Sequence, residues 1–225
     1  MVTAVSDLQT FLGRLTHLDR DAVVRLRPAR PGWTALWARL PWGVLVTREV
    51  SGAPVSGDIT VGAAALLGGG GAPRSGAGGA SQPAGTGGLP PRRDHDWRWP
   101  LPPPGGAVLE EIPPSRLREV SAAAAGTLRE VTETGLAGRP VGVRMLREAL
   151  LDHIAVVVEG GGERLEVPQR LVQAVVRMGF LGADDAPVRV TRADRWVGLA
   201  ARYGTGWLPP RSGPLALRPL RPAGE

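Results

Sequence analysis

The sequence predicts an α+β fold, with a small antiparallel sheet region, a flexible Gly-rich insertion, and a helix-rich second half ending in a β-hairpin. Three observations support this prediction. Residues 22–50 contain short segments in which apolar and charged residues alternate, separated by turn-forming Pro and Gly. Residues 68–88 include ten glycines, which is typical of a flexible segment. Residues 115–179 contain segments with apolar residues at helical spacing.

The first region, residues 1–67, is expected to hold one helix and several strands. The helix is predicted over residues 6–17, where Ser6 and Gln9 have the spacing of a capping box. Its apolar residues form one stripe, Leu8, Phe11, Leu12 and Leu15. Strands follow at 22–28, 33–40 and 43–50, with a shorter one at 58–61. Because the connections are short and contain Pro and Gly, the strands should form an antiparallel meander.

Residues 68–91 are predicted to be a flexible Gly/Pro-rich linker or loop, because such a segment buries little apolar surface. A phosphate-binding loop is not indicated here, since the glycines lack the usual Gly-Lys-Ser/Thr ending. The end of the chain, residues 209–225, is Pro-rich and expected to be irregular.

The intervening region, residues 92–208, is predicted to contain three helices and two hairpins. The helices are expected at 115–134, 142–154 and 169–179, and a short strand precedes them at 108–112. Gly135 and Gly179 fit as helix stops, and Pro168 fits the first turn of the third helix. Hairpins are expected at 155–167 and 188–204. We find no internal sequence repeat.

The composition provides few groups able to perform bond-making chemistry. There is no Cys, which excludes disulfides, a thiolate nucleophile and a Cys-based zinc site. No Ser lies in the Gly-x-Ser-x-Gly pattern of a nucleophile elbow. The three histidines, His17, His95 and His153, are far apart in sequence. We therefore predict no catalytic, metal or cofactor site; a metal-dependent hydrolase is the weakest alternative, since it requires these histidines to converge with aspartates.

The segment RRDHDWRWP, residues 92–100, is the densest in polar and aromatic groups. The prolines that follow and the tryptophan pair favour an extended strand. In a strand, alternate side chains share a face, so His95 should point away from Asp94 and Asp96. We interpret the segment as a strand that fastens the linker to the core through Trp97 and Trp99.

The leading functional hypothesis is a non-catalytic binding or regulatory protein whose partner is another protein. Seven tryptophans provide large apolar contact areas. The candidate interface aromatics are Trp97, Trp99, Trp196 and Trp207. The N-terminus lacks the basic and apolar regions of a signal peptide, and no apolar run is long enough to cross a bilayer. We therefore expect a cytoplasmic protein without a membrane partner.

An alternative is DNA or RNA binding through a winged-helix-like module at the C-terminal end. All 27 basic residues are Arg, and the net charge is +6. Residues 187–225 carry seven of these Arg against two acids. A helix followed by an Arg-bearing hairpin is the order found in winged helices. The candidate nucleic-acid or partner contacts are Arg170, Arg177, Arg189, Arg192, Arg195 and Arg202.

Three phrases, EVPQRLVQAVVRMGFLG, RWVGLAARYGTGW and WRWPLPP, are similar to those of conserved actinobacterial proteins with no assigned role. The resemblance extends over most of the chain outside residues 68–88. It implies a bacterial cytosolic protein and assigns no active site.

Overall fold

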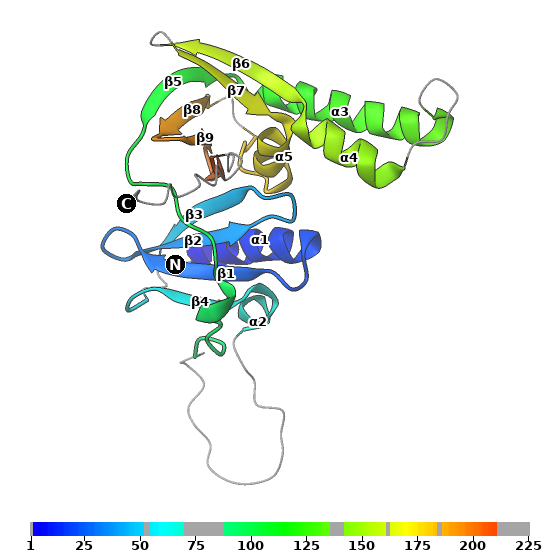
Figure 1. Cartoon of the computed structure of the whole chain (residues 1–225). Helices are drawn as coiled ribbons and strands as arrows, with labels where there is room; N and C mark the ends of the chain where they lie inside the picture. The colour runs from blue at the N-terminus through cyan, green and yellow to red at the C-terminus, as the bar shows by residue number, and fades with distance from the viewer. Residues whose placement is uncertain are drawn as a thin grey trace, which may run out of the picture.

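The computed structural model describes residues 2–51, 55–69, 88–135, 142–160, 163–183 and 186–210. Within these ranges it contains an eight-stranded antiparallel sheet, a separate two-stranded hairpin, and helices packed on one side of the large sheet (Figure 1). The predicted α+β class is confirmed.

The large sheet has the strand order β4-β1-β2-β3-β10-β9-β8-β5. Each half of the chain supplies four neighbouring strands, and the two sets meet where β3 pairs antiparallel with β10. The first set is β1 (Val23–Pro28), β2 (Trp33–Arg39), β3 (Leu45–Ser51) and β4 (Ile59–Gly62). The second set is β5 (Ala107–Ile112), β8 (Val188–Ala193), β9 (Trp196–Ala201) and β10 (Gly204–Leu208).

The helices and the hairpin lie mostly where periodicity and turn residues predict them. They are α1 (Val2–Leu18), α2 (Ala63–Leu67), α3 (Pro114–Thr134), α4 (Val143–Asp152), α5 (Gln169–Arg177), β6 (Ile154–Gly160) and β7 (Glu163–Pro168). In Figure 1, α3, α4, β6 and β7 extend to one side of the large sheet.

Three local predictions need correction. The first helix begins at Val2, four residues before the predicted start. The predicted final hairpin is a three-stranded meander, because the chain turns again after Ala201 and adds β10. Residues 94–96 form a short 3-10 helix instead of part of a strand. The division into regions 1–67, 68–91, 92–208 and 209–225 stays a prediction, and most of the second and fourth regions lie outside the described residues.

The same order of elements occurs twice in the chain. A helix followed by a three-stranded meander appears as α1-β1-β2-β3 and again as α5-β8-β9-β10. The strand order is symmetric about the β3–β10 junction, with β4 and β5 as the two outer strands. The repeat is thus present in the arrangement of elements although none is evident in the sequence.

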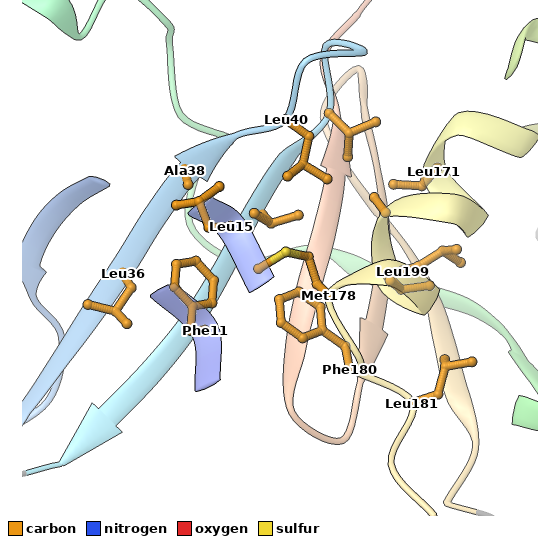
Figure 2. Packing of buried hydrophobic residues seen from close by; sticks show 14 of the residues in the cluster. Phe11, Leu15, Leu36, Ala38, Leu40, Leu171, Met178, Phe180, Leu181 and Leu199 are labelled. Atoms are coloured by element: carbon orange, nitrogen blue, oxygen red, sulfur yellow. The ribbon is translucent and has the colours of Figure 1, made fainter. Parts of the chain in front are cut away.

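One hydrophobic core serves both halves. Phe11 of α1 and Phe180, which follows α5, stack with ring centroids 6.4 Å apart and planes 9° apart. Figure 2 shows Leu15 of α1 and Met178 packed beside these rings, above the strands. Because buried residues of both meanders contribute to this cluster, the helices cover a single continuous sheet face.

The opposite sheet face carries a smaller cluster that contains several tryptophans. Buried Val23, Leu45, Trp97, Ala193 and Trp196 form its centre, and Trp37, Trp99, Leu101 and Trp207 pack around them. In Figure 1 the segment between the 3-10 helix and β5 crosses this face, from the side of β4 to the opposite side of the sheet. The crossing segment therefore supplies part of the cluster.

Candidate functional site

A pocket of about 860 Å³ lies between the two repeated helices, α1 and α5. Its lining comes from both halves of the chain: α1, β3, α3, α5, the loop after α5 and the turn between β9 and β10. The pocket is open to solvent and is therefore a surface hollow, not an enclosed cavity. The lining residues are Asp7, Thr10, Arg14, Arg48, Arg118, Val176, Arg177, Gly179, Leu181, Gly182, Ala183 and Tyr203.

Two of the four lining arginines are bound within the protein. Arg48 pairs with Asp7, with 2.7 Å between Nη2 and Oδ1, and its side chain is only 9% exposed. The same guanidinium lies 5.3 Å from the centroid of the Tyr203 ring. Arg118 donates from Nη2 to the backbone carbonyl of Gly182 at 2.5 Å. Both arginines therefore help to shape the pocket.

The other two arginines, Arg14 and Arg177, are exposed and have no carboxylate partner within the described part of the chain. Arg177 lies over the Trp42 ring at 5.7 Å and makes a long hydrogen bond of 3.4 Å to Gln173. The guanidinium of Arg14 lies against the backbone of Gly179, where an added Cβ would overlap it. Neither guanidinium group is neutralised by a carboxylate of the described residues.

Gly179 explains how Arg14 can reach this place. Its φ of +64° ends α5 in a Schellman motif, in which Gly179 N–H donates to Val176 and Phe180 N–H donates to Val175. This left-handed conformation favours glycine, which confirms the predicted helix stop. The missing side chain leaves room for the guanidinium of Arg14.

Among the described residues that line the pocket, Asp7 is the one carboxylate against four guanidinium groups, a balance that favours anionic groups. Among the described residues, no group of three or more His, Cys, Asp or Glu side chains is placed to hold a metal ion. His17 lies in the last turn of α1, His95 in the 3-10 helix and His153 just after α4. The structure does not bring the three histidines together at the pocket.

The arginines singled out in the sequence lie on different surfaces. Arg177 lines the pocket, whereas Arg170 donates to the Trp42 carbonyl at 2.8 Å and to Asp152 at 2.5 Å, joining α5 to α4 and to the turn after β2. Arg189 lies on the tryptophan-bearing face of the sheet. It pairs with Ala200 of β9, and the same row of cross-strand neighbours continues through β10 and β3 to Trp37 of β2.

Of the remaining three arginines of that set, Arg192 lies near the end of β8, and Arg195 and Arg202 lie in turns. Arg192 donates to the carbonyl of Asp194 at 2.9 Å, beside exposed Arg195 in the turn between β8 and β9. Arg202 lies next to Tyr203 in the turn after β9, with its guanidinium 6.0 Å from that ring. Helix α5, the predicted groove-reading helix, buries Leu171, Val172 and Val175 in the core.

The predicted interface tryptophans all belong to the cluster on the other sheet face. Trp97 is 8% exposed and Trp196 is 6% exposed, so neither offers much free surface. Trp99 and Trp207 are half-buried and pack around them. Trp97 donates its indole N–H to the Trp99 carbonyl at 2.8 Å, and their rings meet edge to face.

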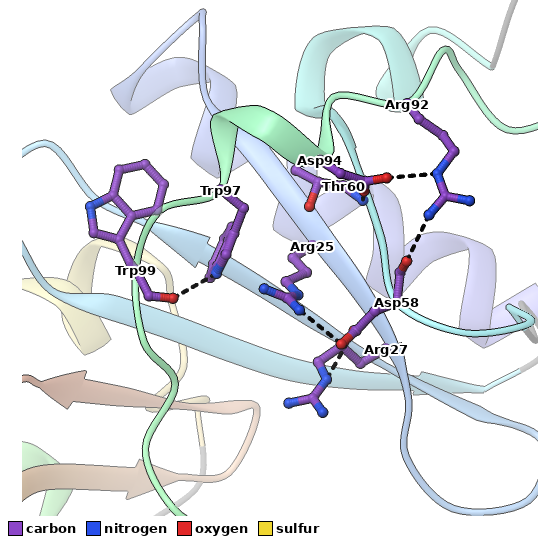
Figure 3. A network of polar contacts seen from close by, with 8 residues as sticks. All are labelled: Arg25, Arg27, Asp58, Thr60, Arg92, Asp94, Trp97 and Trp99. Carbon is purple, nitrogen blue, oxygen red and sulfur yellow. Dashed lines mark hydrogen bonds and ion pairs between the residues drawn. The ribbon is translucent and has the colours of Figure 1, made fainter.

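The segment RRDHDWRWP does fasten the chain to the sheet, through an antiparallel bridge between Arg92 and Val61 of β4 and through side-chain hydrogen bonds of the short 3-10 helix (Figure 3). Asp94 Oδ1 accepts the Thr60 N–H of β4 at 2.7 Å, and Oδ2 accepts Nε of Arg92 at 2.7 Å. Arg93 N–H donates to the Thr60 carbonyl at 2.7 Å. His95 lies 3.3 Å from the Asp96 carboxylate, so the expected separation of their side chains is wrong.

This anchor should respond to acid. The Thr60 N–H, followed by the Arg92 guanidinium, lowers the pKa of Asp94 below the ordinary aspartate value. The stabilisation is therefore present above the ordinary pKa and is lost as the pH falls through the lowered one. We expect the Trp97 indole N–H signal in NMR spectra to shift with a midpoint below the ordinary pKa, and Asp94→Asn to abolish that transition. A midpoint at or above the ordinary pKa would contradict the anchor.

Sequence reasoning missed Arg14, Arg48 and Arg118. They belong to α1, β3 and α3, and no local motif connects them. Arg48 could have been found from the sequence. Alternation in β3 places it on the same buried face as Val46 and Val50, where a charged side chain is unexpected. An inward-pointing arginine requires a partner, which here is Asp7.

Two family models match the chain. One, described as a domain of unknown function (DUF8185), covers residues 101–213, and the other, a domain of unknown function (DUF8010), covers residues 2–86. No curated protein matches the chain in sequence. Among the described residues, no helix is long and apolar enough to cross a membrane.

Solved structures of sliding clamps share the fold. The DNA polymerase III β subunit of Bartonella birtlesii, bound to griselimycin, has 13% identity and a TM-score of 0.53, over 93% of this chain and 64% of the clamp. The clamp of Pseudomonas aeruginosa with ligand has 15% identity and a TM-score of 0.51, over 93% and 63%. The β subunit of Thermotoga maritima has 12% identity and a TM-score of 0.50, over 92% and 62%. The chain thus spans less than two thirds of these clamps.

Proposed function

This chain belongs to the DUF8185 family, and from its fold and its pocket we propose that it is a non-catalytic protein that binds another protein. The observation that carries the proposal is the pocket between α1 and α5, which offers two available guanidinium groups beside apolar side chains. The pocket brings together groups that can bind a ligand. Among the described residues, neither a nucleophile–base pair nor a metal-ligand cluster lies there.

The fold supports this function. The Bartonella birtlesii protein is by its name a sliding clamp and a subunit of DNA polymerase III, and the arrangement of elements is similar in this chain. We infer by analogy a chain that contributes a binding surface to an assembly. Lys and Asn, whose codons are A-rich, are absent from the chain, and this composition supports a high-GC genome. The phrases quoted above support an actinobacterial origin and a cytoplasmic location.

The proposal predicts a stoichiometric protein partner. A photo-crosslinking amino acid placed at Thr10, which lines the pocket, should capture that partner in the native cell, whereas the same amino acid at Arg189 should not. Mass spectrometry of the crosslinked bands identifies the captured chain. Recovery of no stoichiometric protein from either position would overturn the proposal.

Nucleic-acid binding is the second candidate, because four arginines surround one pocket. It requires an affinity that falls steeply with salt, since phosphate contacts release counterions. Fluorescence anisotropy with a single-stranded and a double-stranded oligonucleotide at low salt measures this directly. Equal affinity of the parent and a variant with Ala at Arg189, Arg192 and Arg195 would exclude the winged-helix mode of contact.

A further inference from the structure

We propose that the pocket between α1 and α5 binds an acidic peptide segment of the partner protein. Arg14 and Arg177 pair with its carboxylates, and an apolar side chain next to these carboxylates packs against Val176, Leu181 and Tyr203. The inference rests on the proposed function, since it specifies the chemistry by which the partner is recognised.

The charge balance of the pocket favours an anion. The pair of Asp7 and Arg48 is internally neutral. Arg118 is held by the uncharged Gly182 carbonyl, and no carboxylate among the described residues pairs with it. Arg14 and Arg177 add two more positive charges without a carboxylate partner among the described residues. An acidic segment would balance this excess through charge-assisted hydrogen bonds.

The two available guanidinium groups are already supported by their surroundings. Arg14 lies against the Gly179 backbone, and Arg177 lies over the Trp42 ring. A guanidinium that is held by packing loses less conformational freedom on binding than a free one. This support restrains both side chains without neutralising either charge.

The walls of the pocket favour a peptide over a nucleic-acid backbone. Val176 and Leu181 present apolar surface beside the charges, and Tyr203 presents an aromatic ring. A phosphate backbone requires a continuous track of cations, but Arg170 is bound to Asp152 and Arg189 belongs to the opposite sheet face. A short segment with alternating acidic and apolar side chains matches both the charge and the walls.

NMR titration of the full chain with defined peptides tests the proposal. The probes are acetylated octapeptides with an Asp-Glu pair placed before or after a Leu or a Phe, together with twins that carry Asn-Gln. The acidic peptides should shift the Nε–H signals of Arg14 and Arg177 saturably, whereas the amide twins should not. If no acidic peptide shifts these signals at about 5 mM, where even a weak site would be partly filled, the proposal fails.

Substitutions separate the pocket from general charge effects. Arg14→Gln and Arg177→Gln should each weaken acidic-peptide binding by about fivefold to tenfold, because each removes one charge-assisted contact. Arg189→Gln removes the same charge from the other sheet face and should leave the affinity unchanged. If all three variants weakened peptide binding equally, the effect would come from the net charge of the protein, and the proposed site would be wrong.

The outcomes also distinguish this inference from the proposed function. If crosslinking captures a partner that binds the Arg14→Gln variant and the parent with the same affinity, that result would support the proposed function and contradict the assignment of the pocket as the binding site. Saturable binding of the acidic peptides without any captured partner would support peptide binding by the pocket and contradict the proposed function. Tighter binding of a twelve-nucleotide single strand than of any peptide, weakened by Arg14→Gln, would assign the pocket to nucleic acid.

Discussion

Replacing Phe180 with Ala should lower the free energy of unfolding of the whole chain by about 3–5 kcal/mol. The side chain is fully buried, stacks on Phe11 of α1, and lies close to Gly204 at the start of β10. Removing it leaves a cavity where both meanders meet, and the close-packed surroundings can fill it only in part. Urea unfolding followed by circular dichroism and by tryptophan fluorescence measures the change.

The two probes should report one shared transition, because the core is continuous across the halves. Circular dichroism follows the helices, and the tryptophans lie mainly on the other sheet face. Met145→Ala is a suitable control, since this side chain is 71% exposed on α4 and its loss should cost less than about 0.5 kcal/mol. Two separated transitions, of which Phe180→Ala shifts only one, would show that the halves fold independently.

The second large effect is expected from Gly204→Ala, which should destabilise the chain by about 2–3 kcal/mol. An added Cβ would lie 2.6 Å from the carbonyl oxygen of Thr47 and 2.7 Å from the Phe180 ring. The carbonyl belongs to the backbone of β3, so relief requires movement of the junction between β3 and β10. Thermal and urea unfolding both measure the loss.

Gly126→Ala provides a matched control for this substitution. Gly126 lies within α3, and an added Cβ there meets no other atom within 4 Å. Ala favours helix over Gly by about 1 kcal/mol, so this variant should be as stable as the parent or more stable. If the two Gly→Ala variants had equal stability, the close approach of β3 and β10 at Gly204 would be refuted.

Local chemistry was sufficient for most elements. Alternation predicted β1 and β3, and the helical spacing of apolar residues predicted α3 and α5. Gly179 predicted the end of α5 because a left-handed residue favours glycine. The prediction was wrong at residues 94–96, where side-chain hydrogen bonds to β4 favoured a turn over the extended form. The partner, the Thr60 N–H of β4, lies more than thirty residues earlier in the chain, so the sequence of residues 94–96 alone does not reveal it.

The sequence by itself therefore determined the class of fold and the positions of most helices and strands. Those properties depend on residue types and on spacings of two to four positions, which act within one element. Only the tertiary structure decided that β3 pairs with β10, that both halves share a core, and that Arg14, Arg48, Arg118 and Arg177 surround one pocket. The physical reason is that these contacts join residues distant in the chain, and their formation depends on how apolar faces pack together.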